Sequence, residues 1–393
     1  MPSVVRTILV VAVAALLAMQ VVRTALIADP STRNSIAPRL WPSHPTVLTN
    51  RTMAEIGAHA ARGQTPPPEI LREVEAIAHK APLAPEPFLI KGALAQVEGR
   101  QERAERLFLA ARMRDPRSAA ARYFLADRYL RTVRIAPALA EIAALSRLYV
   151  EARAQFGPAL ATFAQMPGGV PQLRRFFRTS PELEPFVLAH LANDARNADL
   201  VLALWGRRPV DPKAPPPDWQ GTLIRKLIEQ GQFAKAYATW RLVAGVDRGA
   251  GTIFNPGFRK IPAPPPFNWD FSATGGVVEP APGDRLQVIY YGRQDAVLAE
   301  QLLMLAPGRY QLGMDISGPL GDGGELAWTL SCVPRPEVIF RLPINRRGRI
   351  TGKFGVPQNC PVQSFRLTAL PGPFPQSQEF TIGGLGLIKE SGE

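Results

Sequence analysis

Cysteine and histidine are scarce in this chain, which has two cysteines and four histidines among its 393 residues. A zinc site needs several clustered Cys or His ligands, and neither cysteine, Cys332 or Cys360, has a histidine nearby in the sequence. The chain also contains no H-E-x-x-H motif, no G-x-S-x-G motif and no phosphate-binding glycine loop. The sequence therefore predicts no metal, no cofactor and no catalytic residue.

Acidic residues are outnumbered in the first part of the chain. The net charge is +13, and from Thr252 onward 13 Lys and Arg residues face 12 Asp and Glu residues, so an excess of +12 lies before Thr252. Most of these cations are arginines. A basic surface attracts phospholipid head groups, acidic polysaccharide or nucleic acid. The simpler interpretation is a set of solvated, arginine-rich helix faces.

Long apolar runs are also rare, and the one candidate lies at the N-terminus. The run Thr7–Val22 is followed by Arg23 and by a second apolar piece, Ala25–Ala28. Sixteen residues fall short of the ~20 that usually span a bilayer, but Arg23 can extend its side chain toward the interface. No convincing signal-peptidase site follows. We predict a signal anchor over 1–28, with cleaved secretion as the alternative.

This anchor predicts a single-pass protein of a bacterial inner membrane, with its body in the periplasm. Residues 29–50 are rich in Pro, Ser, Thr and Asn and are predicted to form a tether. Exported chains fold in an oxidising compartment, so we expect a disulfide between Cys332 and Cys360. Two unpaired thiols are the alternative.

Short helices rich in Ala, Leu and Arg, separated by Pro and Gly, are predicted between residues 51 and 250. Their large and small residues recur at fixed spacings. The first copy comprises Phe88, Gly92, Ala95, Gly99, Ala104, Phe108, Ala111 and Pro116. A weaker copy lies 34 residues on, at Ala126, Tyr129, Ala138, Ile142 and Leu145. A third comprises Leu227, Gly231, Phe233, Ala236, Trp240 and Val243.

These residues resemble the tetratricopeptide repeat, which stacks 34-residue helical hairpins into an α-solenoid. A generic helical array is the alternative. The resemblance implies a concave groove that binds an extended segment of a partner protein, and we expect Arg103, Arg106 and Arg122 to line it. A second basic and aromatic patch lies at Arg174–Phe177. An exported protein rarely meets nucleic acid, so no nucleic-acid partner is expected.

Strand-like segments replace the helices in residues 251–393, predicting an antiparallel β-sandwich or jelly roll. Pro and Gly turns separate eight predicted strands. They are Asn268–Ser272, Leu286–Tyr291, Glu300–Leu305, Tyr310–Ser317, Leu326–Val333, Val338–Pro343, Ser364–Ala369 and Glu379–Ile388.

The motifs Asn255–Phe258, Phe267–Asp270 and Leu305–Tyr310 resemble those of the carbohydrate-binding-module jelly roll. The resemblance implies sugar binding by aromatic side chains, and the candidate ligand residues are Trp269, Tyr291, Trp328, Arg346 and Arg347. Neighbouring residues of a strand point to opposite faces, so the tryptophans can instead belong to the core.

Hydrolysis of sugars would need two carboxylates across a cleft. The candidates Asp270, Asp315, Asp322 and Glu325 are not paired by any feature of the sequence. We therefore expect a non-catalytic envelope scaffold that binds protein partners through the helical repeats and a polysaccharide through the sandwich, in exopolysaccharide assembly or export. A sugar-active enzyme, or its carbohydrate-binding accessory module, is the alternative.

Overall fold

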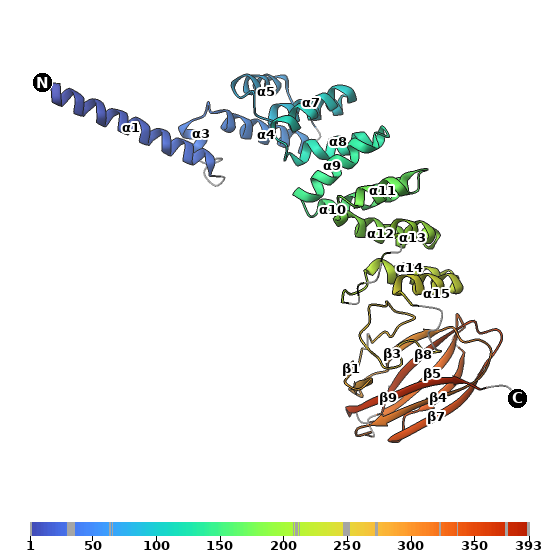
Figure 1. The fold of residues 1–393 in the computed structure, drawn as a ribbon. Helices are drawn as coiled ribbons and strands as arrows, with labels where there is room; N and C mark the ends of the chain where they lie inside the picture. The colour runs from blue at the N-terminus through green and yellow to red at the C-terminus, as the bar shows by residue number, and fades with distance from the viewer. Residues whose placement is uncertain are drawn as a thin grey trace. The chain divides into compact units, whose positions relative to one another are not determined.

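The computed structural model describes residues 2–29, 36–62, 64, 66–206, 208, 211, 213–246, 252–271, 274–321, 324–335, 337–373 and 376–390. Two compact units divide the chain, Met1–Arg153 and Ala154–Glu393. Helices make up the first unit, and the second consists of helices followed by a sandwich of two antiparallel sheets (Figure 1). The predicted order of helices and then a β-sandwich is confirmed. The predicted boundary between residues 250 and 251 lies outside the described residues.

The N-terminal helix α1 spans Pro2–Ala28 and is long and apolar enough to cross a membrane. Its segment Val10–Ala28 has a mean hydropathy of 2.2, and residues 10–22 of that segment are exposed throughout. A signal sequence has the same length and composition. Arg23 does not end the helix, which continues to Ala28. The Arg23 guanidinium lies 5.5 Å from the centre of the Trp41 ring.

Residues 36–50, which belong to the predicted tether, are partly helical. The short helix α3 spans Ala37–Leu40, and α4 spans Pro45–Ala61. Proline is favoured in the first turn of a helix because its missing N–H has no partner there, which suits Pro38 and Pro45. Ala37, Val47 and Ile27 of α1 form a small buried cluster, with Trp41 packed against it. Apolar contact therefore holds this segment in place.

Five further helices of the first unit are joined by short turns, and together with α4 they form helical hairpins (Figure 1). They are α5 (Pro68–Lys80), α6 (Glu86–Val97), α7 (Gln101–Arg114), α8 (Ala119–Arg131) and α9 (Ile135–Leu148). Hairpins α6–α7 and α8–α9 occupy the first two copies of the sequence repeat. The 34-residue spacing of the pattern therefore corresponds to one helical hairpin.

The same turn recurs in the three repeat copies. The backbone N–H of Arg100 donates to the carbonyl of Ala95 at 2.8 Å, and the same bond joins Arg134 to Tyr129 at 2.8 Å and Gln232 to Leu227 at 2.9 Å. The residue before the donor has positive φ in each copy: Gly99, Val133 and Gly231. Glycine adopts this left-handed conformation without strain, whereas Val133 has a Cβ that disfavours it.

Buried positions repeat with the turns. Ala104, Ala138 and Ala236 are fully buried one turn into the second helix of each hairpin. Four residues later come the larger side chains Phe108, Ile142 and Trp240, all buried. A Cβ at Gly92 would lie 3.0 Å from the Phe108 ring, so a larger residue would require that ring to shift, and glycine suits the close approach of the two helices of that hairpin.

The second unit begins with further short helices. They are α10 (Ala152–Ala164, which starts at the boundary), α11 (Gly169–Phe177), α12 (Glu184–Ala192), α13 (Ala198–Trp205), α14 (Asp218–Glu229) and α15 (Phe233–Ala244), with 3-10 turns at Pro181–Leu183 and Ala195–Asn197. The hairpin α14–α15 is the third repeat copy.

Nine strands are present among the described residues of the sandwich: β1 (Gly276–Ala281), β2 (Arg285–Tyr290), β3 (Ala296–Leu303), β4 (Gly308–Ser317), β5 (Gly324–Val333), β6 (Val338–Pro343), β7 (Gly348–Val356), β8 (Val362–Pro371) and β9 (Gln378–Lys389). One sheet has the order β1-β2-β9-β4-β7 and the other β3-β8-β5-β6. Their inner faces enclose a core that includes Trp328, Tyr310 and Phe380.

Two edge strands, β1 and β7, were not predicted. Pro280 and the neighbouring glycines of β1 indicate a turn, and Arg346–Arg349 with Gly348 indicated a loop before β7. Edge strands tolerate proline and charge because one side of the strand has no partner. The predicted strand Asn268–Ser272 is instead an irregular segment with a single bridge from Asp270 to Glu300, and Ser272 lies outside the described residues.

Cys332 of β5 and Cys360, which precedes β8, form a disulfide with an S–S distance of 2.07 Å. The predicted pairing of the two cysteines is confirmed. Both sulfur atoms belong to buried residues of the sandwich core. The bond therefore links the end of β5 to the segment before its neighbour β8.

Reduction of this disulfide should lower the free energy of unfolding of the sandwich by about 3 kcal/mol, because the bond closes a loop of sequence separation 28 in the unfolded chain. Guanidinium denaturation with and without reductant measures the difference. A Cys332→Ala/Cys360→Ala variant is the control, and its unfolding midpoint should not respond to reductant. Equal midpoints of the oxidised and reduced wild-type protein would contradict the prediction.

Candidate binding site

The irregular segment Thr252–Phe271 of the second unit is held against helix α15 by aromatic contacts. The Trp240 indole N–H donates to the Pro264 carbonyl at 2.8 Å. The Trp240 ring also meets Phe254 edge-on, with ring centres 4.8 Å apart, and lies 5.7 Å from Phe267. This proline-rich segment therefore has a fixed course between the last helix and the sandwich.

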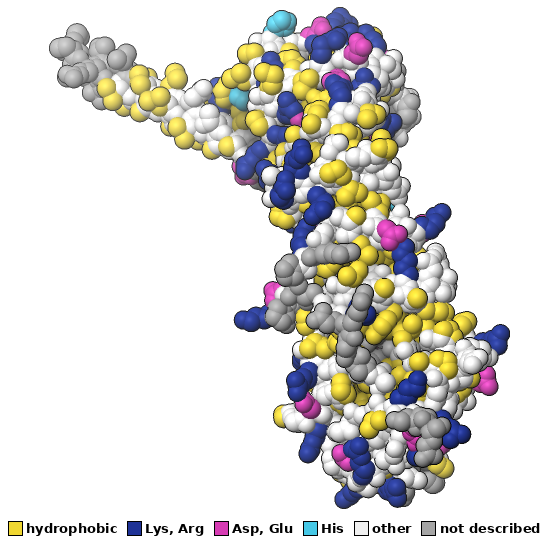
Figure 2. Space-filling view, turned by 45° about the vertical axis from the view of Figure 1, so that its right-hand side comes forward, with side chains coloured by type: hydrophobic (Ala, Val, Ile, Leu, Met, Phe, Trp, Pro, Cys, Tyr) yellow, Lys and Arg dark blue, Asp and Glu magenta, His cyan; other side chains and the backbone are white. Residues whose placement is uncertain are grey.

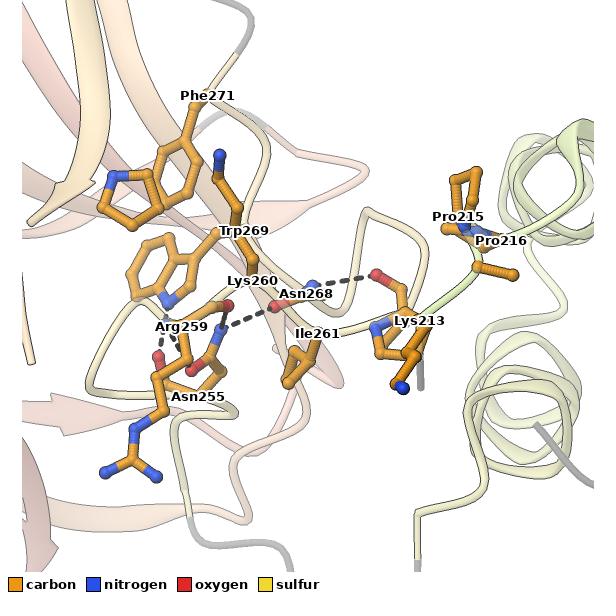
Figure 3. Close-up of a pocket in the computed structure, with 14 residues that line it drawn as sticks. Lys213, Pro215, Pro216, Asn255, Arg259, Lys260, Ile261, Asn268, Trp269 and Phe271 are labelled. Carbon is orange, nitrogen blue, oxygen red and sulfur yellow. Dashed lines mark hydrogen bonds between the residues drawn. The ribbon is translucent and has the colours of Figure 1, made fainter. Parts of the chain in front are cut away.

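A cavity of about 490 Å³ opens beside this segment. The loop Lys213–Pro216 forms one side, and residues between Asn255 and Phe271, together with Pro280, form the other (Figure 3). The lining combines three cations, Lys213, Arg259 and Lys260, with an apolar wall. That wall comprises Pro215, Pro216, Ile261, Pro262, Trp269, Phe271 and Pro280. We call this space the lysine cavity.

Side-chain amides fix the shape of the lysine cavity (Figure 3). The Asn255 Oδ1 accepts from the Arg259 N–H at 2.9 Å, and its Nδ2 donates to the Arg259 carbonyl at 2.7 Å. Asn255 itself has a φ of 52°, a conformation that asparagine tolerates better than most residues. The Trp269 indole N–H donates to the Asn255 carbonyl at 2.8 Å. The wall is therefore preformed.

The cations of the lysine cavity differ in their pairing. Arg259 donates to both carboxylate oxygens of Asp284, at 2.7 and 2.5 Å. Hydrogen bonding by Arg259 holds the pKa of Asp284 below its usual value, so this pair stays ionised at neutral pH. No described carboxylate forms an ion pair with Lys213 or Lys260, and none of the described lining residues is Asp or Glu. The cavity is therefore cationic.

The predicted ligand residues are not gathered at one site. Trp328 is 0% exposed and stacks on Phe365 with ring centres 4.3 Å apart, so its expected role in sugar binding is wrong. It points inward because it pairs with core positions of β8 and β6. Trp269 is 5% exposed and is one of the residues that line the lysine cavity.

The other three predicted ligand residues lie elsewhere on the sandwich. Tyr291 follows β2 and is 41% exposed, while Arg346 and Arg347 are exposed in the turn between β6 and β7. None of them lines the lysine cavity. Within the described sandwich, Tyr291 is the one aromatic residue that is largely exposed, so the outer faces of the sheets present no aromatic strip.

The carboxylates considered for hydrolysis are separated. Asp315 of β4 is paired with Arg349 at 3.0 Å, and Glu325 of β5, on the other sheet, is paired with Arg341 at 2.6 Å. Asp270 makes a backbone bridge to β3, and Asp322 lies outside the described residues. In the described parts of the chain, no group of three or more His, Cys, Asp or Glu residues is placed to hold a metal ion.

The arginines predicted for a partner groove have different surroundings. Arg103 and Arg106 are exposed on α7. Arg122 is half-buried and donates to the buried carboxylate of Glu141 at 2.6 Å, so it braces α8 against α9. Arg122 therefore has a structural role, because the buried Glu141 needs cationic partners, and its role in a partner groove stays a prediction. On the face shown in Figure 2, many Lys and Arg side chains are exposed with few Asp and Glu between them.

A second acid, the partly buried Glu105 of α7, links two hairpins. Arg134 donates to both of its oxygens at 2.7 and 2.6 Å, and Arg128 to one at 3.4 Å. Hydrogen bonding by Arg134 is the main cause that lowers the pKa of Glu105 below its usual value. Arg122, Arg128 and Arg134, together with Arg112, which also pairs with Glu141, therefore serve the packing of the helices.

Lys213, Lys260 and Phe271, which line the lysine cavity, were not predicted as site residues. Lys213 lies in the proline-rich stretch 209–217, which indicates a break between helices, and Lys260 lies just before the stretch 262–266, which indicates a linker. The one sequence signal that could have found them is the combination of lysine, otherwise rare here, with a run of prolines.

Comparisons with known proteins show structural likeness but no family. No family model matches the chain, and no curated protein matches it. The β region has carbohydrate-binding modules among its structural neighbours. A CBM4 structure is 12% identical, with 35% of this chain and 99% of that chain covered and a TM-score of 0.27. A TmCBM61 structure in complex with β-1,4-galactotriose is 14% identical, with 31% and 88% covered and a TM-score of 0.23. A MamA RS-1 ArsTM double mutant is 16% identical, with 51% and 95% covered and a TM-score of 0.25.

Proposed function

We propose that this protein is a non-catalytic binding protein whose second unit holds an acidic glycan in the lysine cavity. The observation that carries the proposal is the lining of that cavity. Lys213 and Lys260 supply two positive charges with no described carboxylate partner, beside a preformed wall of Trp269, Phe271 and prolines.

This lining suits a charged sugar. Pyranose rings bind proteins through their apolar faces, and aromatic or proline side chains offer the complementary surface. A uronic acid adds a carboxylate, which an ammonium group attracts and to which it can donate a hydrogen bond. Neutral sugars would leave both lysines without an anion, so the cavity favours an acidic polysaccharide over a neutral one.

The rest of the chain supports a scaffold role for this binding. Helix α1 provides an apolar segment for attachment to a membrane, and the hairpins with exposed Arg103 and Arg106 offer a surface for a protein partner, as in tetratricopeptide repeats. The finer form of the proposal is a single-pass protein of the bacterial inner membrane, with its body in the periplasm, that acts in exopolysaccharide assembly or export. The separation of Asp315 from Glu325 counts against glycoside hydrolysis.

The Lys213→Gln/Lys260→Gln variant of the full chain should bind polygalacturonate about tenfold more weakly than the wild-type protein. Each exposed charge pair contributes about 0.5–1 kcal/mol, and 1.4 kcal/mol corresponds to tenfold in affinity. Isothermal titration of the detergent-solubilised protein with polygalacturonate, and with neutral dextran for comparison, measures the effect. Binding of dextran should be weaker than binding of polygalacturonate in the wild-type protein.

Lys226→Gln is the matched control, since Lys226 is a partly exposed lysine of the same unit that lies outside the cavity and pairs with Glu229. Its affinity for polygalacturonate should equal that of the wild-type protein. Equal affinity in the double variant would contradict the assignment of the cavity. Release of reducing sugar ends during incubation with polygalacturonate would contradict the non-catalytic role.

A further inference from the structure

A second cavity of the second unit, of about 440 Å³, has four arginines among its seven lining residues. Its walls are Pro171, Arg174, Arg175 and Arg178 from α11 and its end, and Trp205, Gly206 and Arg208 from the end of α13. The helices α11 and α13 pack side by side (Figure 1). We call this space the arginine cavity; it shares no lining residue with the lysine cavity.

Helix α11 gathers its arginines on one face. Pro171, Arg174, Arg175 and Arg178 have the spacing i, i+3, i+4, i+7, which places them along a single stripe. Leu173, Phe176 and Phe177 are buried on the opposite face. Like charges three and four residues apart on a helix destabilise it slightly, so this stripe has an energetic cost. The C-terminal end of α11 carries the negative end of the helix dipole, which offsets part of that cost for the α11 arginines. It does not stabilise Arg208, which lies outside α11.

Few negative charges balance the arginine cavity. Arg208 donates to both oxygens of the buried Glu184, at 2.7 and 2.6 Å, so its charge is compensated and its guanidinium is held in place. No carboxylate of the described chain forms an ion pair with Arg174, Arg175 or Arg178. Three guanidinium groups around one cavity therefore remain without an anion.

The floor of the arginine cavity is built to bring these groups together. Gly206 ends α13 with a φ of 72°, and a Cβ at this position would lie 2.7 Å from Nη2 of Arg174. The Arg174 guanidinium thus lies directly over the turn from the neighbouring helix. Trp205 meets Trp219 edge-on at 6.1 Å, which holds the Trp205 ring as a flat apolar wall.

We propose that the arginine cavity binds the phosphate group of a phosphorylated ligand. A planar carboxylate is saturated by one or two guanidinium groups, whereas a tetrahedral phosphate offers three terminal oxygens in different directions, matching the three unpaired guanidinium groups of Arg174, Arg175 and Arg178. The cavity has the size that small-molecule sites usually have, so it holds more than the phosphate itself. Trp205 and Pro171 contact the remaining part of the ligand.

Inorganic phosphate titrated into the detergent-solubilised full chain tests the site. Calorimetry at constant ionic strength should show phosphate binding more tightly than acetate. The Arg174→Gln/Arg178→Gln variant should lose affinity for phosphate on the order of tenfold or more, because two charge-assisted contacts are removed. Its thermal midpoint should not fall, since the change relieves like-charge repulsion on α11.

Two controls separate this site from other cations. Arg225→Gln changes an exposed arginine of α14 that bonds only to Thr222 in the described structure, and it should bind phosphate like the wild-type protein. Lys213→Gln/Lys260→Gln should also bind phosphate normally, so that failure of the glycan proposal and failure of this one are distinguishable. Undetectable phosphate binding, or equal affinity in the Arg174→Gln/Arg178→Gln variant, would overturn the proposal.

Competition identifies the source of the phosphate. Displacement of inorganic phosphate by phosphatidylcholine vesicles that contain phosphatidic acid, but not by phosphatidylcholine alone, indicates a lipid head group. Displacement by glucose 1-phosphate indicates a soluble or glycan-linked phosphate. Either result supports a site for a phosphorylated ligand, and failure of both competitors overturns it.

Discussion

Replacement of Trp240 by alanine should destabilise the second unit by about 3–5 kcal/mol, the usual cost of removing a fully buried tryptophan. Trp240 is 0% exposed, packs against Tyr237, Phe254 and Phe267, and donates to the Pro264 carbonyl. It fills the repeat position of Phe108 and Ile142 but also fixes the segment that forms the lysine cavity. The same substitution should therefore weaken polygalacturonate binding as well as folding.

Urea denaturation followed by fluorescence measures the change in stability, and calorimetry measures the change in binding. Trp240→Phe should lose less stability, because an aromatic ring remains in the core. Loss of the hydrogen bond to Pro264 should cost about 1 kcal/mol, in addition to a smaller loss of packing. Leu242→Ala is the control on the same helix, since Leu242 is largely exposed. A loss below about 1 kcal/mol in Trp240→Ala would show that this ring does not join α15 to the segment.

Replacement of Glu141 by alanine should destabilise the first unit by about 3–5 kcal/mol, because removal of one partner leaves buried charges uncompensated. Glu141 of α9 is 3% exposed, and its two oxygens accept separately from Arg112 of α7 and Arg122 of α8. Without the carboxylate, two guanidinium groups would face each other in a partly buried space.

Thermal or urea unfolding of the first-unit transition measures the cost. Glu102→Ala, at an exposed position of α7, should change stability by less than about 0.5 kcal/mol. Adding Arg122→Leu to Glu141→Leu should recover part of the loss, because apolar residues can replace a buried ion pair at little cost. Unchanged stability of Glu141→Ala, or no recovery in the double variant, would contradict the bracing role of this acid.

The helical repeats could be predicted because their packing demands particular residue sizes. Ala104, Ala138 and Ala236 lie where two helices cross closely, and a larger side chain would not fit there, so the spacing is visible in the sequence. The turn after the first helix is less visible. Gly99 and Gly231 indicate it, but Val133 adopts the same left-handed conformation, and its residue type gives no sign of this.

The sandwich could be predicted from alternating strands, but not its edges. Strands β1 and β7 contain proline, glycine and arginine because one side of each strand needs no partner, and these residue types are also typical of turns.

The roles of Trp269 and Trp328 depend on which face of the chain is buried. Only the tertiary structure shows that Trp328 lies between the sheets and that Trp269, although buried, also lines the lysine cavity.

The two cavities could not be predicted from the sequence, for the same physical reason. Each combines residues from segments far apart in the chain: residues 213–216 with 255–280 in one, and α11 with the end of α13 in the other. Arg174 and Arg175 were recognised as a basic patch, but Arg178 and Arg208 join them only through the packing of α11 on α13. The spacing of residues along the sequence cannot show that these side chains lie close together in the fold.

The structure of the full chain with a bound galacturonate oligomer tests the central claim most directly. We expect a uronate carboxylate within hydrogen-bonding distance of the Lys213 or Lys260 ammonium group, with a pyranose ring against Phe271. An oligomer seated instead at Arg346 and Arg347, or on the outer face of either sheet, would contradict it.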